Sequence, residues 1–199
     1  MSFTENLREG RLGEDLISQW FIRRGWQVLP AYETSIISGK GPRLFGAYGQ
    51  LICPDLLVFN DTLFLWIEAK FKSAFTWHRL SSSWQTGIDL RHWRDYQQVD
   101  QRTPMDVWIF FLHKPLGCAK DTPTGHVSPA GLFGQTVKKL TSCVHHTHAN
   151  HGPSGMAYWT LSSFILLANW EDVWTAPGHS QPAISASGER PEARRHDTR

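Results

Sequence analysis

Apolar and polar positions follow distinct periods along this 199-residue chain and divide it into segments. In residues 5–24 the apolar side chains recur every three to four positions and Gly25 follows, which predicts an amphipathic helix with its stop signal. The stretch WQVLPAYE, residues 26–33, predicts a short strand interrupted at its proline. Residues 35–49 contain four glycines and a proline, which predict a loop.

Two apolar runs, residues 51–59 and 63–71, predict a β-hairpin with a tight turn at Asn60 and Asp61. A two-residue turn places Asp55 opposite Trp66, so that Asp55, Glu68 and Lys70 share one face. Asp55 and Glu68 are then diagonal neighbours, about 7–8 Å apart at the backbone. Because the flanks are apolar, we expect these charges to be buried, where charges are paired or bind metals.

The chain that follows the hairpin is patterned less regularly. Residues 87–99 predict a helix with Ile88, His92 and Tyr96 on one face, and residues 106–113 (DVWIFFLH) predict a buried strand. Beyond Gly117 the chain is mostly loop; residues 135–144 fit either a strand or a short helix. Residues 156–170 predict a strand followed by a helix, and residues 176–199, almost without apolar side chains, predict a disordered tail.

Composition limits the class of protein. With 41% hydrophobic and 19% charged residues, the chain fits one soluble globular domain, and a net charge of +2 neither demands nor excludes nucleic acid. No apolar run reaches the length of about 18 residues that a membrane helix needs, and the polar start carries no signal peptide. Three widely spaced cysteines favour a reducing, cytoplasmic location over a disulfide scaffold.

Pro54-Asp55, twelve residues, and then Glu68-Ala69-Lys70 resemble the signature of the PD-(D/E)XK nuclease superfamily, which includes restriction endonucleases, archaeal-type Holliday junction resolvases and RecB-type nuclease domains. The resemblance covers about residues 5–113, where helix, strand, acidic hairpin, helix and strand follow one another in the order of the family's αβββαβ core. It implies an α/β, restriction endonuclease-like fold with a central mixed sheet flanked by helices. We expect a single nuclease-like domain over residues 1–175, with residues 114–175 as a C-terminal extension and residues 176–199 as the tail.

The resemblance implies hydrolysis of DNA phosphodiesters with Mg²⁺, for which Mn²⁺ substitutes. Asp55 and Glu68 would bind the metal and Lys70 would orient the attacking water. Glu14, which borders the apolar stripe of the first helix, would extend the metal site; alternatively it is an acid that favours the helix dipole. Mg²⁺ prefers oxygen ligands and keeps several waters, so two carboxylates and a substrate phosphate suffice.

Further residues are candidates for contact with substrate. His92 and Tyr96 stand where resolvase-like and RecB-type members often carry a Gln-x-x-x-Tyr pair; the histidine is a departure, and either Gln97 or Gln98 could replace the missing glutamine. Lys72 follows the motif directly, and Lys40 and Arg43 lie in the glycine-rich loop, where they could contact the DNA backbone. His92 fits a core-edge histidine equally well.

Several alternatives stay open at this point. A Holliday junction resolvase-like endonuclease, acting in DNA repair or recombination, would be a symmetric homodimer, whereas a RecB-like exonuclease would need free ends. A catalytically inactive DNA-binding module of the same fold and a protein–protein adaptor with internally paired charges are the rivals from other classes. Cys143 and His145, His146, His148 and His151 contain ligands that suit zinc, but not at finger spacing, so structural Zn²⁺ and a substrate-contacting loop are both open.

Overall fold

We describe a computed structural model of the chain over residues 3–31, 42–47, 49–115 and 122–174. Its helices and strands are, in chain order, α1 (Phe3–Ile22), β1 (Gln27–Pro30), β2 (Arg43–Gly46), β3 (Gly49–Ile52), β4 (Leu56–Phe59), β5 (Phe64–Lys72), β6 (Thr76–His78), β7 (Ser83–Asp89), α2 (Leu90–Arg102), β8 (Asp106–His113), β9 (Gly131–Thr136), α3 (Val137–Thr141), β10 (His146–His148), β11 (Met156–Thr160), the 3-10 helix η1 (Leu161–Ser163), β12 (Ile165–Ala168) and α4 (Trp170–Trp174). The expected tail, residues 176–199, lies outside the described residues.

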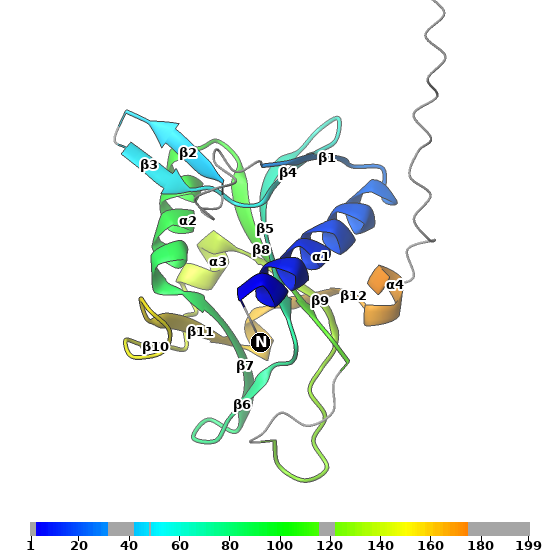
Figure 1. Ribbon diagram of the computed structural model, residues 1–199, viewed down its shortest axis with the longest axis vertical. Helices are drawn as coiled ribbons and strands as arrows, with labels where there is room; N and C mark the ends of the chain where they lie inside the picture. Colours follow the sequence, from blue (N-terminus) through cyan, green and yellow to red (C-terminus); the bar gives the residue numbers. More distant parts are fainter. Residues whose placement is uncertain (1–2, 32–41, 48, 116–121, 175–199) are drawn as a thin grey trace, which may run out of the picture.

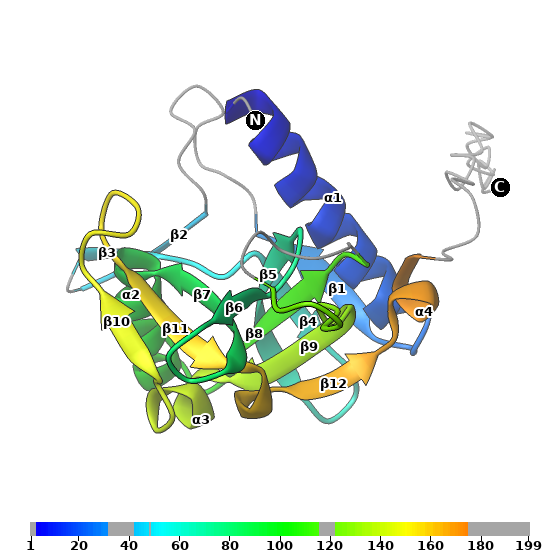
Figure 2. The ribbon, with the colours of Figure 1, turned by 90° about the horizontal axis from the view of Figure 1, so that it is seen from below.

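A six-stranded mixed sheet forms the centre of the molecule, in the order β1-β4-β5-β8-β9-β12 (Figure 1). β5 and β8 pair in parallel, and every other pair in this sheet is antiparallel. Helix α1 crosses one face of the sheet, while α2 and α3 lie on the other (Figure 2). The elements α1, β1, β4, β5, α2 and β8 follow one another as the αβββαβ core requires, so the predicted α/β fold class is confirmed.

The two faces of the central sheet bury separate apolar clusters. On β5 the side chains of Ile67 and Ala69 pack under α1 with Ile17 and Phe21, since successive residues of a strand alternate between faces. The opposite cluster contains Tyr96 and further buried residues of α2, α3 and β8. Glu68 and Lys70 alternate with Ile67 and Ala69, so they face the α2 side of the sheet.

The hairpin has a longer turn than the sequence suggested. Phe59 pairs with Phe64 instead of Thr62, and the two rings stack at 5.3 Å. Asn60 spans the four-residue turn: its Oδ1 accepts hydrogen bonds from the N–H groups of Thr62 and Leu63 at 3.0 and 2.9 Å. The side chain of Asn60 therefore replaces the backbone of a tight turn.

Other boundaries also differ from the expectations. Residues 43–46 and 49–52, predicted as loop and then strand, pair as β2 and β3 in a separate two-stranded sheet. Helix α2 begins at Leu90, so Ile88 belongs to β7 and does not share a helix face with His92 and Tyr96. Asp89 ends β7 and caps the helix, its side chain accepting a hydrogen bond from Arg91 N at 2.9 Å. Residues 135–144 contain the short helix α3, which resolves that alternative.

Beyond α2 the extension adds more strand than loop. β9 and β12 complete the central sheet, and residues 156–170 contain β11, η1 and β12 in place of one strand and one helix. β10 and β11 join β7 and β6 in a second, antiparallel sheet of order β10-β11-β7-β6. Within the described ranges, no helix has the length and apolar character needed to cross a bilayer.

Candidate active site

Asp55 and Glu68 lie directly across the β4–β5 hairpin from each other. Leu56, the first residue of β4, pairs with Ile67 of β5. Continuing this register by one position places Asp55, which directly precedes β4, opposite Glu68. The longer turn thus moves Asp55 from the predicted diagonal position to a direct one on the same face. Oδ2 of Asp55 accepts a hydrogen bond from Ala69 N at 2.9 Å, which holds the carboxylate against β5.

Lys70 completes this cluster on the next outward position of β5. Its Nζ forms an ion pair with Oε1 of Glu68. Glu68 is 1% exposed, and its second oxygen, Oε2, is buried without a hydrogen-bond partner. A buried, unpaired carboxylate oxygen is costly, so this atom is poised to accept a cation or a proton.

A pocket of about 190 Å³ opens onto these three side chains. Its remaining lining comes from three other segments: Pro42 and Arg43 at the start of β2, Ile52 and Cys53 at the end of β3, and Arg91, His92 and Tyr96 of α2. The pocket lining therefore combines the acids Asp55 and Glu68 with the basic side chains of Arg43, Lys70 and Arg91. This charge distribution suits a phosphate held next to a metal-binding carboxylate pair.

The acids of the site repel one another. Burial, and then the charge of Asp55, raise the pKa of Glu68 to about 8, although Lys70 acts in the opposite direction. Burial and the charge of Asp55 likewise raise the pKa of Glu14 to about 7. Burial lowers the pKa of Lys70, but the neighbouring carboxylates outweigh it and its pKa lies above the ordinary value. The charge of Lys70 thus offsets only part of the negative charge of Glu14, Asp55 and Glu68, so the site favours an additional cation.

Glu14 approaches the cluster from the other side of the sheet. It belongs to α1, and the preceding residue, Gly13, lies against Phe71 of β5. The charges of Asp55 and Lys70 act on Glu14, but its side chain does not line the pocket. Glu14 therefore adds negative charge close to Asp55 and Lys70, and its expected part in the metal site stays a prediction.

Helix α2 brings His92 and Tyr96 to the pocket, one turn apart, with their rings 6.1 Å from each other. Tyr96 is buried against Glu68, and its hydroxyl lowers the pKa of that carboxyl. Burial, and then the charge of Lys70, lower the pKa of His92, which favours a neutral imidazole. Gln97 donates instead to Thr141 of α3 at 3.1 Å, and Gln98 does not line the pocket, so neither replaces His92.

The three basic residues predicted to contact substrate differ in where the structure places them. Arg43 lines the pocket as expected. Lys72 lies one outward position beyond Lys70, half-buried and outside the pocket lining; burial and then the charge of Lys70 lower its pKa to about 8. Lys40 lies outside the described residues.

Sequence reasoning missed two residues at the pocket, one that lines it and one that supports its lining. Cys53 lines it directly; burial and the neighbouring Glu68 raise the pKa of its thiol to about 12, so the thiol stays neutral. Asp95 of α2 accepts a hydrogen bond from Ile52 N at 2.9 Å and so fixes the segment that leads into Asp55. Neither has a motif of its own, because the first depends on burial and the second on a contact 43 positions away.

In the part of the chain that the structure covers, no group of three or more His, Cys, Asp or Glu side chains is arranged to hold a metal ion. The histidine-rich segment therefore offers no ready zinc site among the described residues. Cys118, a further cysteine that could supply a zinc ligand, lies outside them. Asp55 and Glu68 still fit Mg²⁺ or Mn²⁺, because these ions need only one or two carboxylates besides water and phosphate. The buried, unpartnered Oε2 of Glu68 supports that fit.

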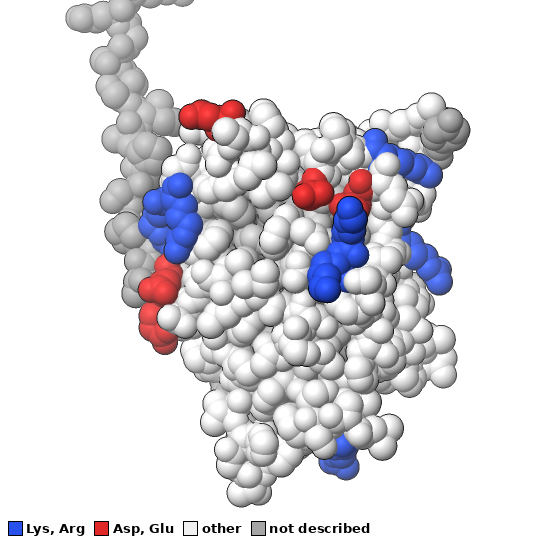
Figure 3. Space-filling view, turned by 180° about the vertical axis from the view of Figure 1, so that it is seen from behind, with Lys and Arg blue, Asp and Glu red and all other residues white. Residues whose placement is uncertain are grey.

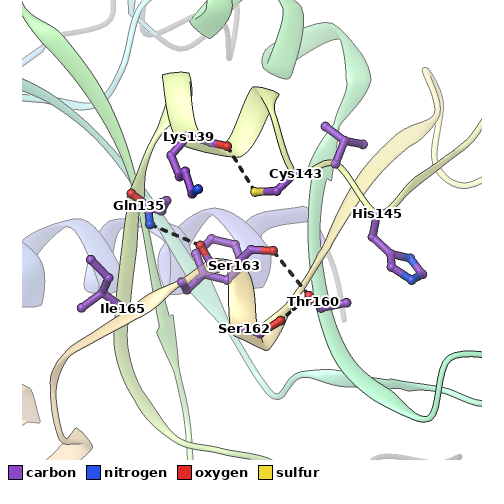
Figure 4. A pocket seen from close by; sticks show the side chains of 10 residues that line it. Gln135, Lys139, Cys143, His145, Thr160, Ser162, Ser163 and Ile165 are labelled. Atoms are coloured by element: carbon purple, nitrogen blue, oxygen red, sulfur yellow. Dashed lines mark hydrogen bonds between the residues drawn. The ribbon is translucent and has the colours of Figure 1, made fainter.

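A larger hollow of about 600 Å³ lies between β9, α3 and η1 (Figure 4). Its lining includes Lys139, His145 and Cys143 but no Asp or Glu, so it has no carboxylate for a metal. The hydroxyls of Thr160 and Ser162 form a hydrogen bond of 2.9 Å.

Lysines, arginines and acids are scattered over the face opposite that of Figure 1, separated by broad uncharged areas (Figure 3). We therefore place the candidate site at the smaller, acidic pocket.

Comparison with known proteins identifies no family model that matches the sequence and no curated protein that matches it. Among solved structures, the chain is similar to Hjc of Archaeoglobus fulgidus, a Holliday junction resolvase from an archaeal hyperthermophile, with a TM-score of 0.46 and 10% identity over 80% of this chain and 92% of that one. It is also similar to D212, a nuclease from a fusselovirus, with a TM-score of 0.38 and 13% identity over 87% of this chain and 90% of that one. At this level of similarity, any function for the chain rests on its own topology and side chains.

Proposed function

We propose that the chain is a metal-dependent deoxyribonuclease of the PD-(D/E)XK type, which hydrolyses phosphodiester bonds in DNA. The observation that carries this proposal is the placement of Asp55 directly opposite the buried Glu68, with Lys70 paired to Glu68 at the base of the same pocket. Two acids and a lysine on one buried face form the arrangement that metal-assisted phosphodiester hydrolysis uses.

Asp55 and Glu68 would hold Mg²⁺ or Mn²⁺, and the buried, unpartnered Oε2 of Glu68 supports this role. A metal bound there lowers the pKa of a coordinated water and offsets charge on a phosphate. Glu14 contributes negative charge from α1, which strengthens the attraction for a cation.

The remaining side chains act on the substrate. Lys70 orients the attacking water and stabilises charge that develops on the phosphate, since it is held beside the acids as an ammonium group. Arg43 and Arg91 neutralise phosphates at the sides of the pocket, and His92 donates a hydrogen bond from a neutral ring. Tyr96 stabilises the ionised form of Glu68.

The two rival functions, an adaptor and a DNA-binding module without catalysis, would each require a different arrangement of charges in this pocket. An adaptor would pair these charges internally, but among the described residues Oε2 of Glu68 is buried without a hydrogen-bond partner, and burial and the charge of Asp55 raise the pKa of Glu68. A DNA-binding module without catalysis has no use for two acids where a phosphate must approach. A resolvase-like enzyme working as a homodimer in DNA repair or recombination is the finer alternative within the nuclease class, and the free thiols of Cys53 and Cys143 suit a reducing cytoplasm.

Cleavage of labelled single strands, linear duplex, closed circles and four-way junctions, with Mg²⁺, Mn²⁺ or EDTA, tests the proposal. We expect metal-dependent cutting that falls at least about 100-fold in Asp55→Asn and Lys70→Ala. Asp61→Asn, in the exposed hairpin turn, and Lys138→Ala, on the exposed side of α3, are matched controls that should keep full activity.

The pattern of substrates separates the alternatives. Paired cuts in the junction by a protein that sediments as a dimer support the resolvase, whereas digestion only from free ends supports an exonuclease. Intact substrates throughout, together with DNA binding that is the same in all variants, would reduce the protein to a binding module.

A further inference from the structure

Five histidines gather on the outer face of the second sheet. We call this surface the histidine face; it consists of His78, His145, His146, His148 and His151. On β11 the inward side chains are Ala157 and Trp159, both buried in the core, while Tyr158 points to the outer side. His145, His148 and His151 are exposed, and His78 and His146 are half-buried.

The histidines form two groups that Tyr158 connects. His78, His145 and His146 lie within 5.0–5.6 Å of one another, ring centre to ring centre. His148 and His151 stack at 3.7 Å. The ring of Tyr158 stacks on His146 at 4.8 Å, and its hydroxyl lies 2.9 Å from Nδ1 of His151.

Gly87 makes this arrangement possible. A side chain on Gly87 would come within 2.7 Å of the Tyr158 ring and 2.6 Å of the carbonyl oxygen of Ala157. Without one, Tyr158 lies over β7. Nε2 of Gln85, two positions earlier on β7, lies 3.1 Å from Nδ1 of His145. The outer side of β7 is therefore built to hold these rings in place.

The β10–β11 loop connects the histidine face to the candidate active site. The β10–β11 loop that carries His151 contacts the start of α2: Leu90 N donates to the carbonyl of Gly155 at 2.9 Å. Arg91 N donates to Oγ of Ser154 at 3.4 Å. The side chains of Arg91 and His92 line the pocket, so a polymer leaving the pocket along the N-terminus of α2 meets this loop next.

The charged groups around the histidine face favour the binding of an anion. Burial and the four other histidines lower the pKa of His146. Asp89 at the end of β7 is hydrogen-bonded to Ser154 and to Arg91 N and acts on His92. Lys139 stands near His145 from the α3 side, and Arg79 follows His78 in the chain. Histidines that repel one another take up protons more readily when an anion binds beside them.

We propose that the histidine face is a second contact surface for double-stranded DNA, which binds the phosphate backbone outside the active pocket and binds it more tightly as the pH falls below neutral. This inference rests on the proposed function for its substrate class. Protonated imidazoles neutralise phosphates, and the mutual repulsion within the cluster falls when they do so. The histidine face would bind the duplex that flanks the cleavage site, so a duplex too short to reach this face should bind without its help.

Fluorescence anisotropy with the full-length Asp55→Asn variant tests this without cleavage. Labelled duplexes of about 10 and about 30 base pairs are titrated at about pH 6 and about pH 7.5, at one fixed salt concentration. We expect the longer duplex to bind about tenfold more tightly at the lower pH, and the short one to change less than about threefold. Adding His145→Gln and His146→Gln should remove most of the gain for the longer duplex.

His126→Gln is the matched control, since His126 contacts Trp77 and is not part of the face; this variant should keep the full gain. Circular dichroism melting confirms that each variant is folded. An equal pH gain with and without the His145 and His146 substitutions would overturn the inference, as would an equal gain for both duplex lengths. Cleavage by the wild-type chain is measured separately, so a failed nuclease proposal with an intact histidine effect remains distinguishable from the reverse.

Discussion

The backbone N–H of Ala69 holds the carboxylate of Asp55 through a 2.9 Å hydrogen bond to Oδ2. This bond links two residues on opposite strands of the hairpin and places Asp55 across from Glu68. One oxygen of Asp55 therefore has a structural role in holding the hairpin. The charge and the hydrogen bond of Asp55 can be removed independently.

Asp55→Asn should keep the stability of the protein and lose its activity. The amide oxygen can accept the Ala69 hydrogen bond, and loss of the charge relieves the repulsion of Glu68 and Glu14. We therefore expect the variant to be at least as stable as the wild type, while cleavage falls at least about 100-fold. Asp55→Ala leaves the Ala69 N–H without its partner and should cost about 1–3 kcal/mol in addition. Urea denaturation measures the difference, and equal stability of the two variants would contradict a structural role for the bond.

Metal affinity should rise with pH up to about pH 8. The folded protein raises the pKa of Glu14 to about 7 and of Glu68 to about 8, from an ordinary 4.5. The metal requires ionised carboxylates, so each proton that it displaces makes binding up to about tenfold tighter per pH unit below these values. Isothermal titration calorimetry with Mn²⁺ from about pH 6 to about pH 9 measures this. A flat profile would show that both acids are already ionised.

The same raised pKa values predict how the metal-free protein responds to pH. An acid whose folded pKa is raised stabilises the fold below its unfolded value of 4.5, and this stability is lost as the pH rises through the folded values of about 7 and 8. Added Mn²⁺ should restore the melting temperature most strongly above pH 8. Glu14→Gln removes one of the two groups, so both the loss and the recovery should become smaller.

Two alanine substitutions in α1 should have opposite effects. A Cβ at Gly13 would lie 2.5 Å from Cβ of Phe71, so Gly13→Ala must move the helix from β5 and should cost about 1–3 kcal/mol. A Cβ at Gly10 meets nothing within 4 Å, so Gly10→Ala should stabilise the helix by about 0.5–1 kcal/mol. Thermal unfolding compares them. If both variants melt above the wild type, the contact between α1 and β5 is looser than described.

His113 should make the protein sensitive to acid. The side chain is 0% exposed and stacks on Phe75 at 3.7 Å, and burial, then the charge of Lys72, lower its pKa from 6.5 to about 3. Its contribution to stability is complete above pH 6.5 and is lost as the pH falls toward 3, by about 1.4 kcal/mol per pH unit. Urea denaturation between about pH 7 and about pH 4 measures the slope.

His113→Phe preserves an aromatic ring beside Phe75 and should flatten that slope, while His148→Gln, at an exposed position, should leave it unchanged. A slope that is equally steep in the His113→Phe variant would assign acid sensitivity to other groups.

Much of the core followed from local pattern. Helix α1, strand β8 and the positions of Asp55, Glu68 and Lys70 on one buried face are all readable from periodicity and apolar flanks. The face was robust because either turn length, two or four residues, leaves Asp55 on the same side of the hairpin. The residue that stands opposite Asp55 could not be predicted in the same way, because it depends on hydrogen bonds that Asn60 makes in the turn.

The sequence by itself determined the order of the elements of the core and the identity of the acidic cluster, since periods of two and 3.6 residues are local properties of a chain. Only the tertiary structure decided what surrounds that cluster. The β2–β3 hairpin brings Arg43 to the pocket, and Tyr96 of α2 lines it too. Asp95 of α2 holds Ile52, 43 positions away, beside the pocket. The second sheet pairs β7 with β11, about 70 residues apart, because each strand buries one face against α2 and the central sheet. Such pairings depend on burial between distant segments, which no local pattern records.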